Sequence, residues 1–315
     1  MEYDKRISDM ANGDAVEGFY ILKAASRRSA ANGKPFLNIT LSDAGGAIEG
    51  KVWDYTGPIG EADAGKIVKI RGTVGEFRGS PQLTTERIRL AEPQDNFNID
   101  ELVPTAPIDA EKEIEFVRSM LASIEDSDYR LICENMLDRH INSFIRIPAG
   151  ISVHHGFLSG LLMHTGNMMR IADFLSEVYP DAVDRSLLIA GTFLHDFAKE
   201  KEYQLSDLGM MTDLTIEGRL LGHLVMGAEE IDRVGAELGI PDEKTLLLKH
   251  MILSHHGKPE FGAAVVPCIA ESELLSYIDM IDSRMEIYAE MFETLPVGKV
   301  SEKNYFLDKR IYNHG

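Results

Sequence analysis

SLLIAGTFLHDFAKE, residues 186–200, is the stretch around which the helical part of the chain is organised. Before residue 195 nearly every position is apolar or small, which predicts a buried helix. His195 and Asp196 nevertheless stand side by side near its end, and Lys199 follows at a spacing that places it on the same helical face. An ionised carboxylate in apolar surroundings is costly unless it is paired or binds a metal. Because a single His-Asp pair is more often a surface or capping pair, the rest of the chain decides between these explanations.

The composition is that of a soluble globular protein with room for two domains. The 315 residues are 44% hydrophobic and 26% charged. No run of eighteen apolar residues occurs, and the start, MEYDKRISDMANGD, lacks the apolar core of a signal peptide. Cys133 and Cys268 show neither metal nor disulfide spacing and are expected to be core thiols. We therefore expect a cytoplasmic protein without a membrane partner, whose oligomeric state the sequence leaves open.

The acidic excess is confined to one part of the chain. A formal net charge of −19 would by itself argue against nucleic acid as a partner. Residues 1–92, however, hold 13 Lys and Arg and 13 Asp and Glu, whereas residues 93–315 hold 19 and 38. A site for divalent cations would offset some of that acidity, so the net charge excludes little.

Residues 14–90 have the pattern of β-strands. In FLNITLSD, residues 36–43, apolar residues at 37, 39 and 41 alternate with polar ones, which is the period of a half-buried strand. Similar strands are expected at 16–24, 47–54, 66–74 and 82–90, with turns at 43–46 and 78–81. Five short strands suit a small closed barrel such as the OB-fold, which commonly binds single-stranded nucleic acid.

Aromatic and basic residues of this segment are candidates for a nucleic-acid contact. Phe36 and Trp53 can supply stacking platforms, and Lys34 and Arg78 can contact backbone phosphates. The wider set of candidates is Phe19, Tyr20, Tyr55, Phe77, Lys51 and Arg71. The alternative is that most of these aromatic residues belong to the core of the barrel.

The chain becomes helical after a linker. Residues 91–108 carry three prolines and no clear period, and Asp109 is a plausible N-cap of the first helix. Further helices are expected near 127–144, 157–178, 184–200, 215–238, 244–256 and 270–292. The sequence thus predicts a multidomain protein with an all-β barrel over residues 1–92, a linker over 93–108 and an all-α domain over 109–315.

Histidines recur in segments of these helices that should be buried. His164 lies in GLLMHT and His223 lies in RLLGHLVMG, both among apolar residues. His255 and His256 end a helix just before Gly257. Taken singly, a histidine on an apolar helical face is usually a hydrogen-bonded core residue.

Carboxylates recur in the same way. In LLSYIDMIDSRM, residues 274–285, Asp279 and Asp282 share with Leu275 and Ile278 the stripe that should face the core, so they need partners. Asp282 has the simpler explanation of a cap, or of an ion pair with Arg284 or a neighbouring helix.

Five helices together place imidazole or carboxylate groups at buried positions, and these ligands suit Mn, Fe, Co, Ni or Zn. Six such groups exceed the needs of one tetrahedral site and suggest two ions.

The order His…His-Asp…Asp on separate helices resembles the HD superfamily of metal-dependent phosphohydrolases. The residues that match its minimal one-metal set are His164, His195, Asp196 and Asp279. Asp279 is preferred to Asp282 because members resemble this stretch as an apolar residue, Asp, two residues and then a polar one. Lys199 matches the lysine that often follows the HD pair.

Two-metal members of that superfamily have two further histidines. His223 matches the first of them, and His255 or His256 matches the second. An OB-like barrel, a short linker and an HD domain follow in this order in the YhaM-type 3′-5′ exoribonucleases. GKPFLNITLSD…GAIEGKVWD resembles their barrel, and HHGFLSGLLMHT and EGRLLGHL resemble their metal-site helices. His154 and His155 resemble the family's double His before the first ligand and are the candidates for a substrate contact.

The resemblance implies hydrolysis of single-stranded RNA from its 3′ end to nucleoside 5′-monophosphates, with single-stranded DNA left open as a further substrate. It also implies two divalent ions, Mn first and Co, Fe, Ni or Zn as alternatives, with Asp196 as the natural bridge between them. His164, His195 and Asp279 would complete one ion, and the remaining histidines the other. Lys199 would neutralise charge that develops on the phosphate.

Two other functions are considered. A nucleotide phosphohydrolase or cyclic-nucleotide phosphodiesterase is the alternative, because fold does not determine substrate. A mononucleotide enzyme, however, has little use for a strand-binding barrel. A single-strand-binding or adaptor protein with a vestigial metal site is disfavoured, because all six ligand positions are intact and a lapsed site has no physical reason to keep buried charge.

Overall fold

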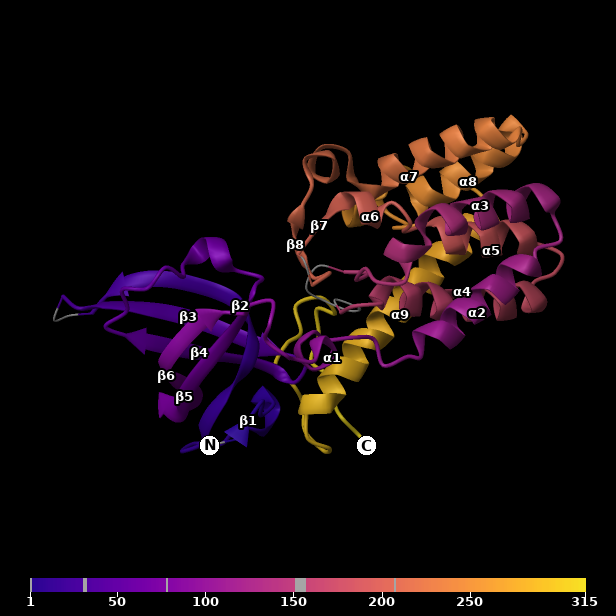
Figure 1. Ribbon diagram of the computed structural model, residues 1–315. Coiled ribbons are helices and arrows are strands. Elements are labelled where there is room, and N and C mark those ends of the chain that lie inside the picture. The colour runs from indigo at the N-terminus through magenta and orange to yellow at the C-terminus, as the bar shows by residue number, and fades with distance from the viewer. Residues whose placement is uncertain (1, 31–32, 78, 151–156, 207) are drawn as a thin grey trace. The chain divides into compact units, whose positions relative to one another are not determined.

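The computed structural model describes residues 2–30, 33–77, 79–150, 157–206 and 208–315. They form two compact units (Figure 1). The first comprises Met1–Thr105 and Leu205–Thr212, and the second comprises Ala106–Gln204 and Asp213–Gly315. Among the helices within these ranges, none is both long enough and apolar enough to cross a membrane.

The first unit contains a closed five-stranded barrel. Its strands are β2 (Ala15–Ser29), β3 (Pro35–Asp43), β4 (Gly46–Trp53), β5 (Ile67–Phe77) and β6 (Ser80–Leu90). They pair in the order β2-β3-β4-β6-β5, and β5 pairs with β2 to close the sheet. Only the β4–β6 pair of the barrel is parallel. This architecture confirms the predicted OB-fold.

The minor elements of this part of the chain are β1 (Glu2–Tyr3), η1 (Ile7–Asp9), η2 (Glu61–Asp63) and α1 (Ile99–Leu102).

Side-chain alternation separates the core of the barrel from its surface. Leu37, Ile39 and Leu41 on β3 are buried, as their period-2 spacing predicts. Tyr20 on β2 belongs to this core, which confirms the alternative interpretation for this aromatic residue, whereas its neighbour Phe19 is buried against Phe97 outside the core of the barrel.

The second unit is a helical bundle. Its helices are α2 (Ala110–Ala122), α3 (Ser127–Phe144), α4 (Gly160–Val178), α5 (Arg185–Leu194), α6 (Lys199–Glu202), α7 (Ile216–Leu238), α8 (Asp242–Ser254) and α9 (Ala270–Thr294), with η3 (Pro259–Phe261) between the last two. Every predicted helix is present, and Asp109 caps α2 as expected. The hairpin of β7 (Tyr203–Leu205) and β8 (Met211–Leu214), of which Leu205–Thr212 belongs to the first unit, was not predicted from the helical pattern.

Helix α5 is the centre of this bundle. It contacts α2, α3, α4, α8 and α9, and its residues from Ser186 to Leu194 are all buried. Asp184 begins the helix by accepting hydrogen bonds from the N–H groups of Ser186 and Leu187. The helix was expected to continue to residue 200, but it ends at Leu194, and a turn over residues 195–198 leads into α6. His195 and Asp196 therefore lie in a buried turn rather than in the body of a helix.

Helix α7 is kinked immediately before a candidate ligand. Gly222 has φ 71° and ψ 160°, a conformation that side chains rarely adopt. The kink leaves the N–H of His223 outside the helical hydrogen-bond pattern, and this group donates to Glu202 Oε1 at 3.0 Å. The sequence predicted one uninterrupted helix over residues 215–238, and this prediction is wrong at Gly222.

The two cysteines lie in different environments. Cys133 is buried in α3, as expected. Cys268 is exposed just before α9, so its interpretation as a core thiol is wrong.

The start of α3 yields a stability prediction with a defined pH dependence. Asp126 caps this helix and accepts from Lys244 Nζ of α8 at 2.5 Å. Burial raises the pKa of Asp126, but Lys244 and the N–H groups of Tyr129 and Asp128 hold it below its ordinary value of 3.8. A depressed carboxyl pKa stabilises the fold above 3.8 and ceases to do so as the pH falls through the folded-state value.

We expect Asp126→Ala to lower the free energy of unfolding by about 1–2 kcal/mol, because it removes a helix cap and an ion pair. Urea unfolding of the metal-free protein should show the same difference at about pH 7 and pH 5 and a smaller one near pH 3.5. A difference that does not change below the ordinary carboxyl pKa would contradict this account.

Candidate metal centre

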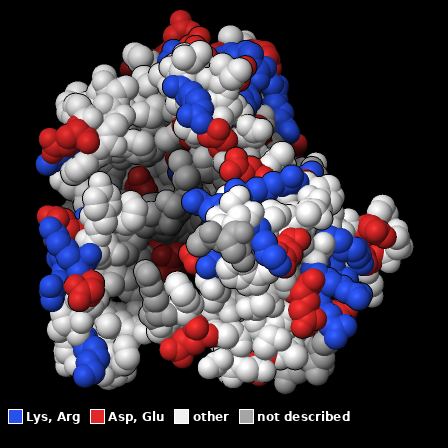
Figure 2. Space-filling model, turned by 90° about the vertical axis from the view of Figure 1, so that its left-hand side faces the viewer, with Lys and Arg blue, Asp and Glu red and all other residues white. Residues whose placement is uncertain are grey.

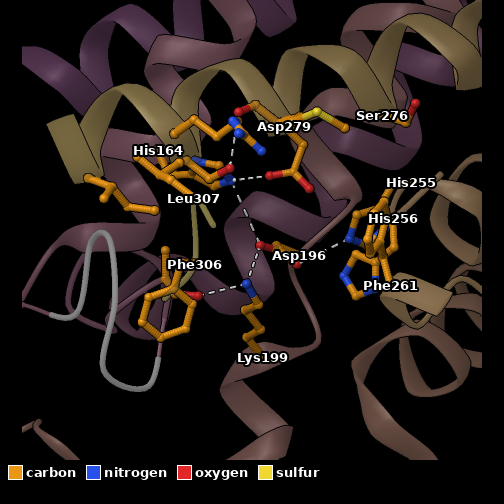
Figure 3. Close-up of a pocket in the computed structure, with 15 residues that line it drawn as sticks. His164, Asp196, Lys199, His255, His256, Phe261, Ser276, Asp279, Phe306 and Leu307 are labelled. Carbon is orange, nitrogen blue, oxygen red and sulfur yellow. Dashed lines mark hydrogen bonds and ion pairs between the residues drawn. The ribbon is translucent and has the colours of Figure 1, made fainter. Parts of the chain in front are cut away.

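Most ligand candidates of the second unit line a cavity of about 490 Å³, and His195 and His223 lie behind Asp196 without lining it (Figure 3). The charged and imidazole side chains that line it are His164, Asp196, Lys199, His255, His256, Asp279 and Arg284. They come from α4, the turn after α5, α6, the end of α8 and α9. Helix packing thus gathers groups that lie more than a hundred residues apart in the sequence.

Asp196 lies at the centre of this cluster, and its two carboxylate oxygens face different histidines. Oδ2 is 3.3 Å from His195 Nε2 and 4.0 Å from His164 Nε2. Oδ1 is 3.4 Å from His223 Nε2 and 3.6 Å from His255 Nε2. This division supports Asp196 as the group shared between two adjacent ligand sets.

Asp279 and Asp282 contact opposite nitrogens of His164. Asp279 Oδ1 is 3.4 Å from Nε2, on the side that faces Asp196. Asp282 Oδ2 is 2.7 Å from Nδ1, behind the ring. The geometry supports Asp279 as the ligand and gives Asp282 the role of orienting His164.

Three other histidines are oriented in the same manner, by a contact at the ring nitrogen that points away from Asp196. In each, Nδ1 contacts an oxygen and Nε2 faces Asp196. The contacts join His195 to the Thr192 carbonyl at 2.7 Å, His255 to the Ile252 carbonyl at 2.8 Å and His223 to the Glu202 carboxylate at 3.0 Å. Such contacts fix the tautomer and leave Nε2 for a metal.

The inward-facing atoms lack hydrogen-bond partners. His195 Nε2, His223 Nε2, Asp196 Oδ1 and His256 Nδ1 are buried, and none makes a hydrogen bond of good geometry among the described residues, although the first three lie within ion-pair distance of one another's groups. Unsatisfied buried polar atoms are rare in native proteins. Imidazole and carboxylate donors suit divalent transition metals, so the residues present fit such a site.

The donors form two groups, and the atoms of each lie within 4.8 Å of one another. One group is His164, His195 and Asp196, and the other is His223, His255 and His256. The sequence left open whether His255 or His256 is the sixth ligand. Because both imidazoles belong to the second group, the structure supports the two together.

The charges of the cluster hold Asp196 in its ionised form. Burial raises the pKa of this carboxyl, but Lys199 and the nearby histidines hold it well below its ordinary value. Burial lowers the pKa of Lys199, and the Asp196 carboxylate raises it above its ordinary value despite that effect. Burial, with His195 and His256 nearby, holds the pKa of His255 well below its ordinary value. Asp196 and His255 are therefore in the deprotonated forms that metal binding requires.

Lys199 bridges the cluster of candidate ligands and the chain before α4. Its Nζ donates to Asp196 Oδ2 at 2.5 Å and to the Ala149 carbonyl at 2.6 Å. Lys199 thus lies on the same side as Asp196, as the i, i+3 spacing predicted, and it also lines the cavity.

The nucleic-acid candidates of the barrel form a separate cluster. Phe36 and Trp53 are paired residues on β3 and β4, and their ring centroids are 5.1 Å apart. Lys51 Nζ lies 5.5 Å from the Trp53 ring and 5.1 Å from the Phe77 ring. Trp53 and Phe77 are each 50% exposed. Lys34 is paired with Asp54 at 3.0 Å, so its charge is partly neutralised.

On the face of the molecule in Figure 2, Lys and Arg side chains are interspersed with Asp and Glu. Attraction of a phosphate backbone grows with local positive charge, and interspersed charges weaken it. Exposed rings are therefore the stronger indication of strand binding on the barrel.

Three residues that the sequence analysis proposed as contacts for nucleic acid or substrate cannot be compared with the structure. Arg78, His154 and His155 lie outside the described residues. The functional candidates that the sequence reasoning missed are Glu202, Arg284, Phe261 and Phe306. No spacing pattern identifies them, because each reaches the site through tertiary packing.

A family model agrees with the geometry of the helical unit: the model for the HD domain matches residues 161–284. An OB-fold domain of replication protein A from Methanococcus maripaludis aligns with 31% of this chain and 100% of its own, at 17% identity and a TM-score of 0.23. The strand order of the closed barrel and the HD match together define an OB-fold protein with a metal-dependent HD phosphohydrolase domain.

Relatives that match along nearly the whole chain give the particular family. The 3′-5′ exoribonuclease YhaM of Listeria welshimeri is 35% identical over 311 residues, 98% of each chain. That of Bacillus subtilis is 35% identical over 301 residues, 95% of each chain. The chain belongs to the YhaM family of 3′-5′ exoribonucleases.

Proposed function

We propose that this chain hydrolyses single-stranded RNA from its 3′ end and releases nucleoside 5′-monophosphates. The observation that carries the proposal is the convergence of imidazole and carboxylate groups around Asp196, several of whose buried atoms make no hydrogen bond among the described residues, beside a cavity that is also lined by two cations, Lys199 and Arg284. The family of the chain supports this reaction. Single-stranded DNA is a second substrate to be tested beside RNA.

Two divalent ions, with Mn²⁺ as the first choice, are the proposed cofactors. His164, His195, Asp196 and Asp279 would hold one ion, and Asp196 with His223, His255 and His256 the other. When bound, the ions would supply Lewis acidity toward the phosphate and activate water for attack.

The remaining polar groups of the cavity bind and orient the substrate. Lys199 Nζ is held by Asp196 and by the Ala149 carbonyl, so it stabilises negative charge on the phosphate without having to reorganise. Arg284, on the same face of α9 as Ser283 and Met280, adds a second positive group to the cavity wall. Asp282 contacts His164 Nδ1 and Glu202 contacts His223 Nδ1, so each carboxylate fixes the orientation of one imidazole ring.

The direct test is incubation of the purified protein with 5′-labelled single-stranded RNA in Mn²⁺ and in EDTA. We expect a ladder that shortens from the 3′ end in Mn²⁺ and intact RNA in the chelator. Replacing Mn²⁺ by Co²⁺, Ni²⁺, Fe²⁺ or Zn²⁺ ranks the metals, and 5′-labelled DNA tests the second substrate. An intact RNA strand under all metals would favour a mononucleotide or cyclic substrate instead.

The barrel is proposed to hold the strand while the helical domain cleaves its end. We expect Trp53→Ala to raise KM for a long RNA roughly 5- to 150-fold and to leave kcat unchanged, because one stacking contact contributes about 1–3 kcal/mol. A dinucleotide, which has no further bases to stack on the barrel once its own phosphodiester occupies the cleavage site, should be cleaved normally. Phe174→Ala is the matched control, since Phe174 is an exposed aromatic residue on α4. An equal loss on both substrates would contradict the division of labour.

A further inference from the structure

The C-terminal segment after α9 is fixed to the helical domain by its own small core. Leu307 and Ile311 are buried against Ile287 of α9. Asn304 Oδ1 accepts from the Leu307 N–H at 2.9 Å, and Asn313 Nδ2 donates to the Leu295 carbonyl at 2.6 Å. The segment therefore returns to α9 in a defined position rather than trailing into solvent.

This anchoring places an aromatic ring at the catalytic cavity. Phe306 precedes the buried Leu307, lines the cavity and remains 54% exposed. Tyr305, its neighbour on the other side, is 86% exposed and is not among the lining residues. Of these adjacent aromatic residues, Phe306 is the one that the fold directs to the cavity.

A second exposed ring lines the cavity beside the histidines. Phe261, at the end of η3, is 59% exposed. Gly257 and Gly262 on either side of it have φ values of 76° and 101°, which let the chain turn sharply after His256. A Cβ at Gly262 would lie 3.2 Å from His256 Nδ1, so this loop packs closely on the candidate ligand.

The two rings and the charged groups divide the cavity. In the view of Figure 3, Phe306 lies on one side of Asp196 and Lys199, and Phe261 lies on the other side with His255 and His256. The volume of about 490 Å³ is in the range of small-molecule sites. The cavity thus offers a charged floor for a phosphate and apolar aromatic walls for a flat ring, which is the chemistry of one nucleotide.

We propose that Phe306 and Phe261 bind the base of the 3′-terminal nucleotide by stacking, which holds its phosphodiester against the metal cluster. This inference rests on the proposed exonuclease function and identifies the terminal-nucleotide subsite within it. Stacking tolerates any base because every base presents a π-face. An enzyme that shortens a strand step by step needs that tolerance, since each nucleotide in turn occupies the same place.

The test compares first-cleavage rates, under single-turnover conditions, on two RNAs that differ only at the 3′-terminal residue. One ends in adenosine and the other in an abasic ribose. For wild-type protein, the protein concentration that gives half the maximal cleavage rate should be lower for the adenosine strand than for the abasic strand.

Phe306→Leu keeps apolar bulk but removes the ring. It should raise this protein concentration roughly tenfold for the adenosine strand and leave it unchanged for the abasic strand.

The variants define the supporting and opposing results. Phe306→Trp should restore binding of the adenosine strand, and Phe261→Leu should behave like Phe306→Leu. Tyr312→Ala is the control, because Tyr312 is an exposed aromatic residue of the same segment that does not line the cavity. Equal effects of Phe306→Leu on both strands, or no effect on either, would overturn the stacking role.

Failure of the subsite and failure of the exonuclease function give different results. If wild-type protein shortens RNA and Phe306→Leu binds the adenosine strand normally, only the subsite is wrong. If wild-type protein does not shorten RNA in any metal, the proposed function itself is wrong. Thermal melting of each variant against wild type shows whether a loss reflects unfolding, which is not expected for a residue that is 54% exposed.

Discussion

Asp196→Asn is expected to abolish RNA hydrolysis, with a fall in kcat/KM on the order of a thousandfold or more. The substitution preserves side-chain volume and removes the negative charge that the two proposed metal positions would share. Oδ1 and Oδ2 lie 3.3 to 3.6 Å from three different imidazoles, so neither proposed position would keep a complete donor set. We therefore expect metal content, measured by atomic emission on the purified protein, to fall together with activity.

Asp232→Asn is the matched control for this variant. Asp232 is an exposed carboxylate on α7 that pairs with Lys249, away from the cavity. It should keep both its metal and its activity. If Asp196→Asn retained its metal and cleaved RNA within tenfold of wild type, Asp196 could not be the shared ligand.

Lys199→Met is expected to separate metal binding from catalysis. Methionine keeps an unbranched apolar stem, one atom shorter than lysine, but places no positive charge beside the phosphate. Removing one preorganised charge of this kind lowers kcat by about 100- to 1000-fold. Metal content should stay near the wild-type value, because the donor atoms identified in the two ligand groups are all retained.

Lys201→Met provides the comparison at a neighbouring position. Lys201 pairs with Glu230 and does not line the cavity, so kcat should change little. A loss of metal in Lys199→Met would mean that Lys199 positions Asp196 rather than acting on the phosphate. A kcat close to that of wild type would remove it from the catalytic groups altogether.

Much of the fold is legible in local patterns. The alternation of Leu37, Ile39 and Leu41 with polar residues identifies a strand because successive side chains of a strand point to opposite faces. Asp109 marks the start of α2 because a short acidic side chain accepts the free N–H groups of a helix end. These rules depend on neighbours in the sequence, so no tertiary information is needed to apply them.

The membership of the site was also predictable, because buried helices seldom carry several imidazoles without a reason. The apolar surroundings of His164, His195, Asp196 and Asp279 pointed to buried polar groups, the resemblance to the HD superfamily implied these four as ligands, and the structure brings all four together. Their exact roles remain predictions that the metal analyses above will test.

The residues that orient the candidate ligands, Asp282 and Glu202, could be identified only from the tertiary structure. Asp279 and Asp282 are less than one helical turn apart, and the rotation of α9 against α4 decides which one meets His164 Nε2 and which one meets Nδ1. Glu202 reaches His223 because Gly222 kinks α7. Rotation and kinking result from the packing of whole helices, which no local pattern encodes.

The sequence by itself determined the succession of a β-barrel and a helical domain, together with the identity of the candidate ligands. Tertiary structure alone decided that Asp196 turns its two oxygens to different histidines, that His255 and His256 both face His223, and that Phe306 reaches the cavity. The reason is physical: secondary structure follows from interactions among near neighbours, whereas a binding site is a set of distances between side chains that only close packing of distant segments can define.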